Sequence, residues 1–338
     1  MIIIKVSSGK ADLNALLLRQ TPNSQGIWKN CRFIVNQPVD RCDWWVVCHR
    51  WGLRTSETTV CDPKHIVFIS MEPEEGALPA QFLKQFSKLV LCDRQIKHSD
   101  ILYLNCLTWW TGINVGHENG HHFYPNVNED YDSFKGMSVP KKMKRISVIC
   151  SNNRHMPGHF KRLAFLEKLR QHPIGKHIDF FGGGFHPILD KLDAIAPYKY
   201  HIALENSLVP DYWTEKLADS FLGFTLPIYY GCPNIFDYFS DKALKQIDLD
   251  NFDRSLAVLE ELMDCDPYES YIESIGIARN QILDDYNIFN ILANICNDPA
   301  ERFTKCRLKS LSLCTGSVPR RLVRSVLHRY RSLRDSIA

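Results

Sequence analysis

Short apolar runs separated by polar connections dominate the first half of the chain. Five of these runs have the length and residue types of buried strands, at positions 2–6, 44–48, 65–70, 88–92 and 101–104. Before the fourth run, residues 78–86 carry apolar side chains at helical spacing. Residues 111–136 are rich in Gly, Asn, His and Tyr and have no clear period, which predicts an irregular connection.

The second half repeats this pattern with better-defined helices. Its predicted strands are residues 145–150, 178–181, 201–204, 225–230 and 246–249. Its predicted helices are residues 159–171, 211–222, 256–265 and 268–282. Strands that alternate with helices of about 10–15 residues indicate parallel, doubly wound sheets. We therefore predict an α/β fold of two such units, with ligands bound in a cleft at the carboxyl ends of the strands.

The length of the chain also favours two domains, because 338 residues exceed the usual size of one. The segment Val139-Pro140-Lys141-Lys142 marks a boundary between the two halves. We predict an N-terminal domain over residues 1–140, a C-terminal domain over 141–300 and a separate tail over 301–338. The composition, 45% hydrophobic and 23% charged, is that of a globular protein and excludes a disordered or fibrous chain.

Cysteine usage and apolar run length bear on the cellular compartment. The twelve cysteines are scattered and form no Cys-x-x-Cys pair, so neither a zinc site nor a disulfide framework is expected. Cys92 and Cys150 end strand-like runs and are expected to be small buried residues. No apolar run approaches the ~20 residues of a membrane span, and the first strand lacks the basic residues that open a signal peptide. These features predict a cytoplasmic protein.

The C-terminal tail is strongly basic. Residues 301–338 hold ten Lys or Arg and two acidic residues, whereas the whole chain has a net charge of only +3. Within the tail, Leu322, Val326, Tyr330, Leu333 and Ile337 form an apolar stripe at helical spacing. Such a helix suits an anionic membrane surface, contacted through residues 318–338, or docks on its own domain with its arginines in solvent. Both interpretations remain open; nucleic acid is disfavoured because the tail has no recognisable motif and the body is acidic.

The densest polar segment follows a predicted strand in the second half. Residues 198–207 read YKYHIALENS, and residues 211–216 read DYWTEK. Asp211 is expected to cap the next helix, whose N-terminus would favour an anion. Lys216 stands in the first turn, where a cation is unfavourable without a nearby anion. Glu215 could accept hydrogen bonds from ribose or sugar hydroxyls, although this segment taken alone favours an ordinary capped helix with a surface Glu-Lys pair.

Further residues favour a diphosphate ligand in the same region. Ser151-Asn152-Asn153-Arg154 follows a strand end, and Arg162 lies on the helix after it, within reach of the same cleft. Arg and Lys side chains that converge on one cleft suit a diphosphate, to which Arg offers a bidentate fork. The run Gly182–Gly184 lacks the Gly-x-Gly-x-x-Gly form, and no Gly-Lys-Ser/Thr loop occurs, so nicotinamide-binding and P-loop proteins are excluded.

These motifs together resemble glycosyltransferase family 10, the α-1,3/4-fucosyltransferases, in its bacterial type. YKYHIALENS, DYWTEK and the following TLPIYYG match the family's donor-site pattern over about residues 145–255, and the first half matches only loosely. The resemblance implies a GT-B fold, two Rossmann-like domains facing a cleft, with the acceptor held by the N-terminal domain and the donor GDP-fucose by the C-terminal one. It implies that the sugar carbon is inverted.

The resemblance also implies roles for individual residues. Arg162 and Lys216 would hold the diphosphate, Tyr212 and Asn206 would line the donor pocket, and Glu215 would bind the ribose. Fixed cations at the leaving group would lower the barrier as negative charge grows on GDP. Trp213, His201 and Cys232 depart from the family pattern and are expected to alter the sugar pocket.

No metal or other cofactor is expected to be required, and a divalent cation is expected at most to stimulate the reaction. Asp-x-Asp occurs at residues 130–132, 248–250 and 264–266, but none of these adjoins the donor motif. His121 and His122 suggest a metal only weakly, because no third ligand is evident.

An inverting reaction needs a carboxylate base on the opposite side of the cleft. The predicted strand at 65–70 runs into Met71-Glu72-Pro73-Glu74-Glu75, and the family has a glutamate after the comparable strand. We therefore predict Glu72 as the catalytic base, with Glu74 in reserve; the alternative is a solvated glutamate loop.

The resulting hypothesis is an inverting transferase that moves L-fucose from GDP-fucose to O3 or O4 of an N-acetyllactosamine-like or other surface glycan, such as a lipopolysaccharide or a protein-linked one. Its oligosaccharide acceptor would bind the N-terminal domain, and the protein would sit at the inner membrane face if its tail binds lipid. Two alternatives remain: the same fold with another nucleotide-sugar donor, or a non-catalytic glycan- or lipid-binding module.

Overall fold

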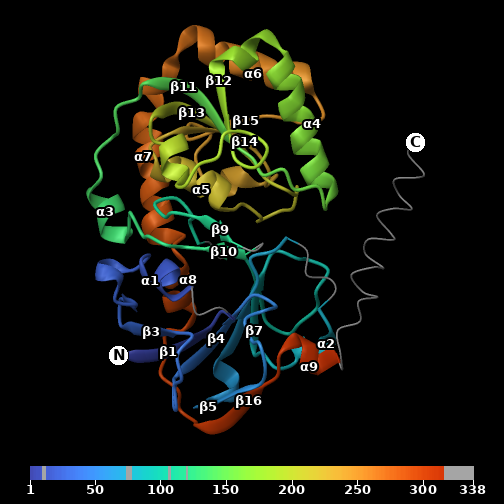
Figure 1. Ribbon diagram of the computed structural model, residues 1–338. Helices are drawn as coiled ribbons and strands as arrows, with labels where there is room; N and C mark the ends of the chain where they lie inside the picture. The colour runs from blue at the N-terminus through green and yellow to red at the C-terminus, as the bar shows by residue number, and fades with distance from the viewer. Residues whose placement is uncertain (10–12, 74–77, 106–107, 119–120, 316–338) are drawn as a thin grey trace, which may run out of the picture.

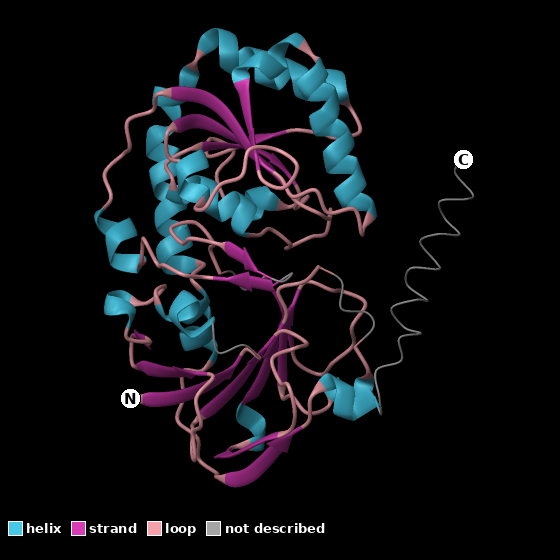
Figure 2. Ribbon diagram, in the orientation of Figure 1, coloured by secondary structure: helices cyan, strands magenta, loops and turns pink. Residues whose placement is uncertain are grey.

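The computed structural model describes residues 1–338 with the exception of 10–12, 74–77, 106–107, 119–120 and 316–338. Two α/β lobes, each built around a sheet of mainly parallel strands, lie one above the other (Figure 1). Helices flank both sheets (Figure 2). Within the described residues, no helix is long and apolar enough to cross a membrane.

The first lobe contains a sheet in the order β2-β3-β1-β4-β6-β7-β8, in which only the β2–β3 pair is antiparallel. Its strands are β1 (Ile2–Ser7), β2 (Ile27–Trp28), β3 (Cys31–Val35), β4 (Trp44–Cys48), β6 (Ile66–Ile69), β7 (Lys88–Leu91) and β8 (Ile101–Tyr103). The helices of this half of the chain are α1 (Leu13–Leu18), α2 (Ala80–Leu83) and α3 (Tyr131–Gly136).

Both faces of the first sheet are buried, which explains the unbroken apolar runs of its strands. Along β4, Val46 and Cys48 belong to one hydrophobic cluster, and Trp45 and Val47 belong to another. Successive side chains of a strand point to opposite faces, so the two clusters lie on the two sides of the sheet.

The second lobe contains the parallel sheet β12-β11-β13-β14-β15. Its strands are β11 (Lys144–Ile149), β12 (Ile178–Phe181), β13 (Tyr198–Leu204), β14 (Leu226–Tyr230) and β15 (Lys245–Gln246). The helices of this lobe, α4 (Pro157–Gln171), α5 (Glu215–Leu222), α6 (Phe252–Cys265) and α7 (Ile272–Asn280), contribute to one large hydrophobic cluster with these strands.

Shorter elements complete the described chain. The hairpin β9 (Gly116–Glu118) and β10 (His121–Phe123) lies between the lobes in Figure 1. The 3-10 turns are η1 (Pro22–Ser24), η2 (Pro63–His65), η3 (Pro173–His177), η4 (Lys191–Ala194), η5 (Ile235–Asp237) and η6 (Pro267–Tyr271), and a π-helical turn, η7, spans Gln281–Asp285.

The chain returns to the first lobe after α7. Helix α8 (Ile288–Ile295) packs into the cluster that contains Val46 and Cys48. Strand β16 (Thr304–Leu308) pairs antiparallel with β5 (Glu57–Cys61), and helix α9 (Leu311–Thr315) follows it. The sequence assigned residues up to 300 to the C-terminal domain and 301 onward to a separate tail, whereas the structure packs residues 288–308 on the first lobe. The predicted amphipathic segment, 318–338, lies outside the described residues.

Several predicted elements agree closely with the structure. Strands β4 and β12 have the predicted bounds, and α4 begins two residues before its predicted start. The predicted helix at 78–86 shrinks to Ala80–Leu83, and the segment expected to be irregular, 111–136, contains β9, β10 and α3. Helix α3 is set by a capping box in which Asp130 and Ser133 bond each other's backbone amides. Cys92 and Cys150 are buried, as predicted.

Candidate active site

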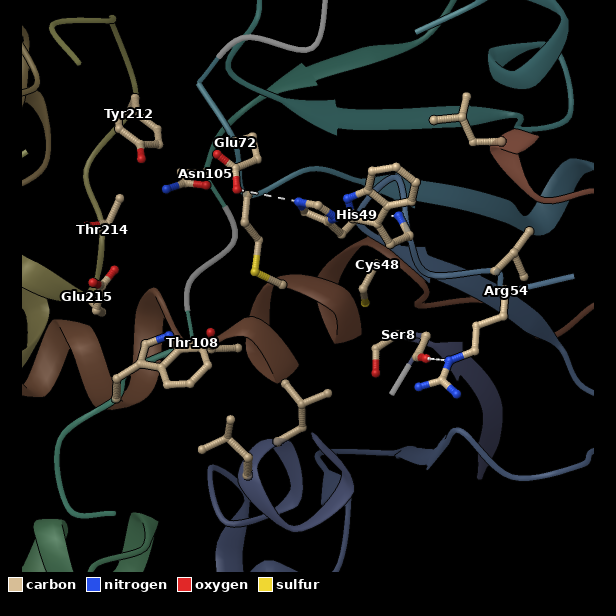
Figure 3. A pocket seen from close by; sticks show the side chains of 18 of the residues that line it. Ser8, Cys48, His49, Arg54, Glu72, Asn105, Thr108, Tyr212, Thr214 and Glu215 are labelled. Atoms are coloured by element: carbon tan, nitrogen blue, oxygen red, sulfur yellow. Dashed lines mark hydrogen bonds and ion pairs between the residues drawn. The ribbon is translucent and has the colours of Figure 1, made fainter. Parts of the chain in front are cut away.

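A cavity of about 720 Å³ opens between the two lobes. The first lobe contributes residues that follow strand ends, among them His49 after β4 and Glu72 after β6, and the second lobe contributes Tyr212 and Glu215 (Figure 3). A second cavity, of about 280 Å³, is lined by Arg162 and other residues of the second lobe. Asn206, Glu215 and Lys216 line both cavities. The structure thus gathers all six sequence-predicted site residues around two adjoining spaces.

The loop between β13 and α5 is organised by the buried residue Glu205. Its carboxylate accepts hydrogen bonds from the backbone amide of Thr214 at 2.7 Å and from the Thr214 hydroxyl. Thr214 is the N-cap of α5 and accepts a bond from the amide of Lys216. Burial raises the pKa of Glu205, against the opposing charge of Lys216. Glu205 is therefore a structural residue that fixes the start of α5.

Asp211 does not cap this helix, contrary to prediction. Its backbone lies in the left-handed region, with φ 65°, so the helix cannot include it, and α5 begins at Glu215 instead. The Asp211 carboxylate accepts hydrogen bonds from Asn234 and Tyr238 and pairs with Arg94 of the first lobe at 2.5 Å. Asp211 consequently links the two lobes beside the cleft.

Charged side chains of opposite sign surround the first turn of α5. Lys216 Nζ lies 3.2 Å from Glu215 Oε1 and 3.5 Å from Glu205 Oε2. Lys191 Nζ lies 3.5 Å from the same Glu215 oxygen and 3.0 Å from Asp219 Oδ2. Burial favours the neutral acid at Glu215, but Lys216 and Lys191 outweigh it and hold its pKa well below the usual range. Glu205 and Glu215 thus supply the anions that the position of Lys216 requires.

Arg162 is a buried cation with hydrogen-bonding capacity left over for a ligand. Its side chain is 4% exposed and donates through Nη1 to the carbonyl of Leu204 at 3.0 Å. Its Nε finds no hydrogen-bond partner among the described residues, and neither does the Oδ1 atom of Asn206. A buried cation and a buried polar atom without partners are costly unless a ligand supplies them. Both line the second cavity, so this space suits an anion that also carries a hydrogen-bond donor.

Close packing places α4 against this pocket. A Cβ atom at Gly158, in the first turn of α4, would lie 1.7 Å from the backbone carbonyl oxygen of Asn206. The glycine is therefore needed for the approach that brings Arg162, one turn further along α4, to the end of β13.

Glu72 faces this region from the first lobe. Its backbone amide donates to Ser70 Oγ at 3.1 Å, and its Oε1 lies 3.5 Å from His49 Nε2. A hydrogen bond from His49 is the main cause that lowers the pKa of Glu72, so the group is an ionised acceptor at neutral pH. Glu74 lies outside the described residues, and His121 and His122 belong to β10.

The three residues that depart from the family pattern have different surroundings. Trp213 is buried in the core of the second lobe, in edge-to-face contact with Phe239 and Tyr286, and Cys232 is also buried; neither belongs to the described residues that line the two cavities. Any effect of these two on the sugar pocket would therefore act through their neighbours, and it stays a prediction. His201 does line the second cavity, where it bonds Ser147 Oγ at 2.8 Å.

The Asp-x-Asp pairs have structural partners. Asp130 caps α3, Asp250 pairs with Lys161, and Asp266 bonds Lys199 and Tyr200. Among the described residues, no group of three or more His, Cys, Asp or Glu could hold a metal ion.

Sequence reasoning missed several residues of the cleft. Asn105 donates to the backbone carbonyl of Trp213 at 2.6 Å and joins the lobes. Lys191 pairs with Glu215 from a short 3-10 turn that belongs to no motif. His49 could have been found, because it stands directly after a predicted strand, at the edge where ligands bind.

Two doubly wound α/β lobes facing a shared cleft constitute the GT-B arrangement, so the predicted fold class is confirmed. Residues 139–273 match the family model described as glycosyltransferase family 10 (fucosyltransferase), C-terminal. That segment runs from β11 into α7, and the predicted resemblance to this family is confirmed over it.

Curated relatives and a solved structure were also compared with the chain. GDP-fucose protein O-fucosyltransferase 3 of Gallus gallus is 29% identical over 155 residues, 44% of this chain and 28% of the relative. Alpha-(1,3)-fucosyltransferase B of Drosophila melanogaster is 27% identical over 175 residues, 49% of this chain and 35% of the relative. The chain thus spans about a third or less of these relatives. The crystal structure of an α1,3-fucosyltransferase with GDP-fucose aligns with a TM-score of 0.46 and 16% identity, covering 81% of each chain.

Proposed function

We propose that this protein transfers L-fucose from GDP-fucose to a hydroxyl, O3 or O4, of an N-acetyllactosamine-like or other surface-glycan acceptor, with inversion at the sugar carbon. The family match of the second lobe supports the choice of donor. The observation that carries the proposal is a single cavity lined by the ionised Glu72 of one lobe and by Tyr212, Glu215 and Lys216 of the other.

The donor would occupy the second lobe. Arg162 and Lys216 hold the diphosphate, and the unpaired Arg162 Nε atom supports this role. Asn206 and Tyr212 line the sugar end of the donor pocket, and Glu215 binds the ribose. Lys191 contributes a further positive charge beside Glu215. As the bond from the fucose carbon to the diphosphate oxygen breaks, its electron pair goes to GDP, and these cations stabilise the charge that develops there.

The acceptor would approach from the first lobe. Its hydroxyl oxygen forms the new bond to the fucose carbon on the face opposite the leaving GDP, and its proton passes to the carboxylate of Glu72. The carboxylate is ionised at neutral pH and can accept this proton, and its place in the cavity opposite the residues of the donor lobe supports the role.

The positive side chains beside the proposed diphosphate site favour departure of GDP without a required metal. A divalent cation would then at most stimulate the reaction. Turnover in excess EDTA, compared with turnover in added Mg²⁺ or Mn²⁺, tests this; loss of all activity in EDTA would contradict it.

Calorimetric titration with GDP, GDP-fucose, GDP-mannose and UDP-sugars tests the donor. Binding of GDP and GDP-fucose alone supports the proposal, whereas preference for another nucleotide sugar assigns the fold to a different donor. GDP-fucose binding without transfer to any glycan acceptor would indicate a non-catalytic module. No binding of guanine nucleotides would reject the proposal.

We also propose that residues 318–338 bind an anionic membrane surface and hold the protein at the inner face of the membrane. The spacing of their apolar and basic residues supports this. Sedimentation with anionic liposomes should be lost when residues 316–338 are removed; unchanged sedimentation would reject it.

A further inference from the structure

We propose that His49 is a positioning residue for Glu72, in which a neutral imidazole holds one oxygen of the carboxylate and orients the other toward the acceptor hydroxyl. This inference rests on the proposed role of Glu72 as the base. It concerns a residue that no motif in the sequence singles out.

The two side chains meet because their strands are neighbours. β4 and β6 run parallel, and His49 and Glu72 follow their carboxyl ends. His49 Nε2 lies 3.5 Å from Glu72 Oε1, and Figure 3 shows the two side chains pointing toward each other at the edge of the cavity. This is a loose contact of the kind that tightens when a substrate binds.

The hydrogen-bond geometry assigns one tautomer to the imidazole. The backbone amide of Trp51 donates to His49 Nδ1 at 3.4 Å, so Nδ1 is the acceptor and carries no proton. The other ring nitrogen of a neutral histidine must then carry it. His49 consequently presents an Nε2–H donor to Glu72.

The backbone holds the imidazole in place. His49 adopts a left-handed conformation, with φ 69°, while its amide donates to the carbonyl of Ile69 at 2.7 Å and its carbonyl accepts from Gly52 at 2.9 Å. A Cβ atom at Gly52 would lie 2.5 Å from the carbonyl oxygen of Cys48, so the turn is compact. A non-glycine residue in this conformation persists only where its surroundings enforce it, and such positions cluster at functional sites.

The contact has a consequence for proton transfer. With Oε1 engaged by the imidazole, Oε2 is the oxygen that takes the proton of the acceptor. His49 lowers the pKa of Glu72, with smaller contributions from Arg50 of the same turn and Lys216 of the opposite lobe. Tyr212 also faces Glu72 across the cleft.

Two substitutions separate this role from a structural one. His49→Asn tolerates the left-handed backbone and keeps an acceptor near the position of Nδ1, but its side chain is too short to reach Glu72. His49→Gln places an amide donor near the position of Nε2. His65→Asn is a matched control, because His65 Nε2 also lies 3.5 Å from a carboxylate, that of Asp298, before the opposite end of β6.

We expect His49→Asn to lower kcat by roughly 10- to 100-fold with an unchanged Kd for GDP-fucose, and His49→Gln to restore most of it. The acidic limb of kcat/KM should move to higher pH in His49→Asn, because the pKa of Glu72 rises when the donor is lost. His65→Asn should move neither kcat nor the limb. If His49 had only a structural role, His49→Asn would lower Tm and activity without shifting the acidic limb of the kcat/KM profile.

A measurement without turnover keeps this test separate from that of the proposed function. The carboxyl ¹³C resonance of Glu72, assigned by comparison with Glu72→Gln, should titrate at higher pH in His49→Asn than in the wild type. An unmoved titration would overturn the positioning role of His49. Full activity of Glu72→Gln, or no transfer from GDP-fucose by the wild type, would instead overturn the proposed reaction. The titration would still show whether His49 pairs with Glu72.

Discussion

The two sides of the cleft are built in different ways. In the second lobe, the site side chains are buried or half-buried in a network of opposite charges, in which Lys216 and Lys191 flank Glu215 and the cap of α5 is fixed by the buried Glu205. In the first lobe, the side chain of Glu72 is 51% exposed and touches one imidazole. The difference suggests a rigid side that binds a charged donor and a more open side that admits acceptors.

The sharpest test of this comparison is removal of the base. Glu72→Gln keeps the shape of the side chain but cannot accept a proton, so kcat should fall by about 10³-fold, within the range of general-base catalysis. The calorimetric Kd for GDP-fucose should stay the same, since the donor site lies in the other lobe. Unchanged turnover would remove Glu72 from the mechanism.

The second prediction concerns donor binding by the second lobe. Arg162→Gln removes a buried cation, and GDP should bind about 10- to 100-fold more weakly, corresponding to about 1.5–3 kcal/mol for hydrogen bonds to a charged group. Lys161→Gln is the matched control, because Lys161 pairs with Asp250, away from the two cavities. Equal affinities of the two variants, measured by calorimetry, would contradict the assignment of the diphosphate site.

A buried, uncharged histidine of the second lobe should also make the protein sensitive to acid. Burial lowers the pKa of His201 to about 3, below its value of 6.5 in the unfolded chain. The unfolded state therefore binds more protons between these values, and stability should fall by about 1.4 kcal/mol for each pH unit from 6.5 toward 3. The free energy of unfolding, measured with urea across this pH range, should change less steeply with pH in His201→Gln. The control His177→Gln, at an exposed position, should keep the wild-type pH dependence.

The smallest effect is expected at the ion pair between Arg94 of the first lobe and Asp211 of the second. Arg94 is 56% exposed, so its ion pair with Asp211 should contribute no more than about 1 kcal/mol. Arg94→Gln should lower Tm slightly and raise the KM for GDP-fucose modestly, because Asp211 adjoins Tyr212. A large loss of stability would show that the link does more than join two lobes that fold by themselves.

The sequence predicted the second lobe and its site better than the first, for physical reasons. A charged pocket at a helix start needs particular residues at fixed spacing, and the segments around Asn206 and Lys216 supplied them. Glu72 could be placed because it follows a predicted strand. Asp211 was misassigned because nothing local reveals its left-handed backbone, which depends on contacts with distant Asn234 and Arg94.

Other features could not be predicted from local patterns. β3 was missed because its apolar run, Phe33–Val35, is only three residues long and follows the charged Arg32. Lys191 joins the site through a 3-10 turn, and its role depends on how the lobe folds around α5. The apolar pattern of α8 gives no indication of which sheet it covers, so the sequence assigned it to the wrong lobe.

The return of α8 to the first lobe sets an order of events during synthesis on the ribosome. β1, β4 and β6 emerge early, but part of one face of their sheet stays uncovered until residues 288–295 have left the ribosome. The second lobe, from β11 to η7, is continuous in sequence and can close as it emerges. The half of the protein translated first would thus be the last to finish folding, with part of its apolar sheet exposed until then.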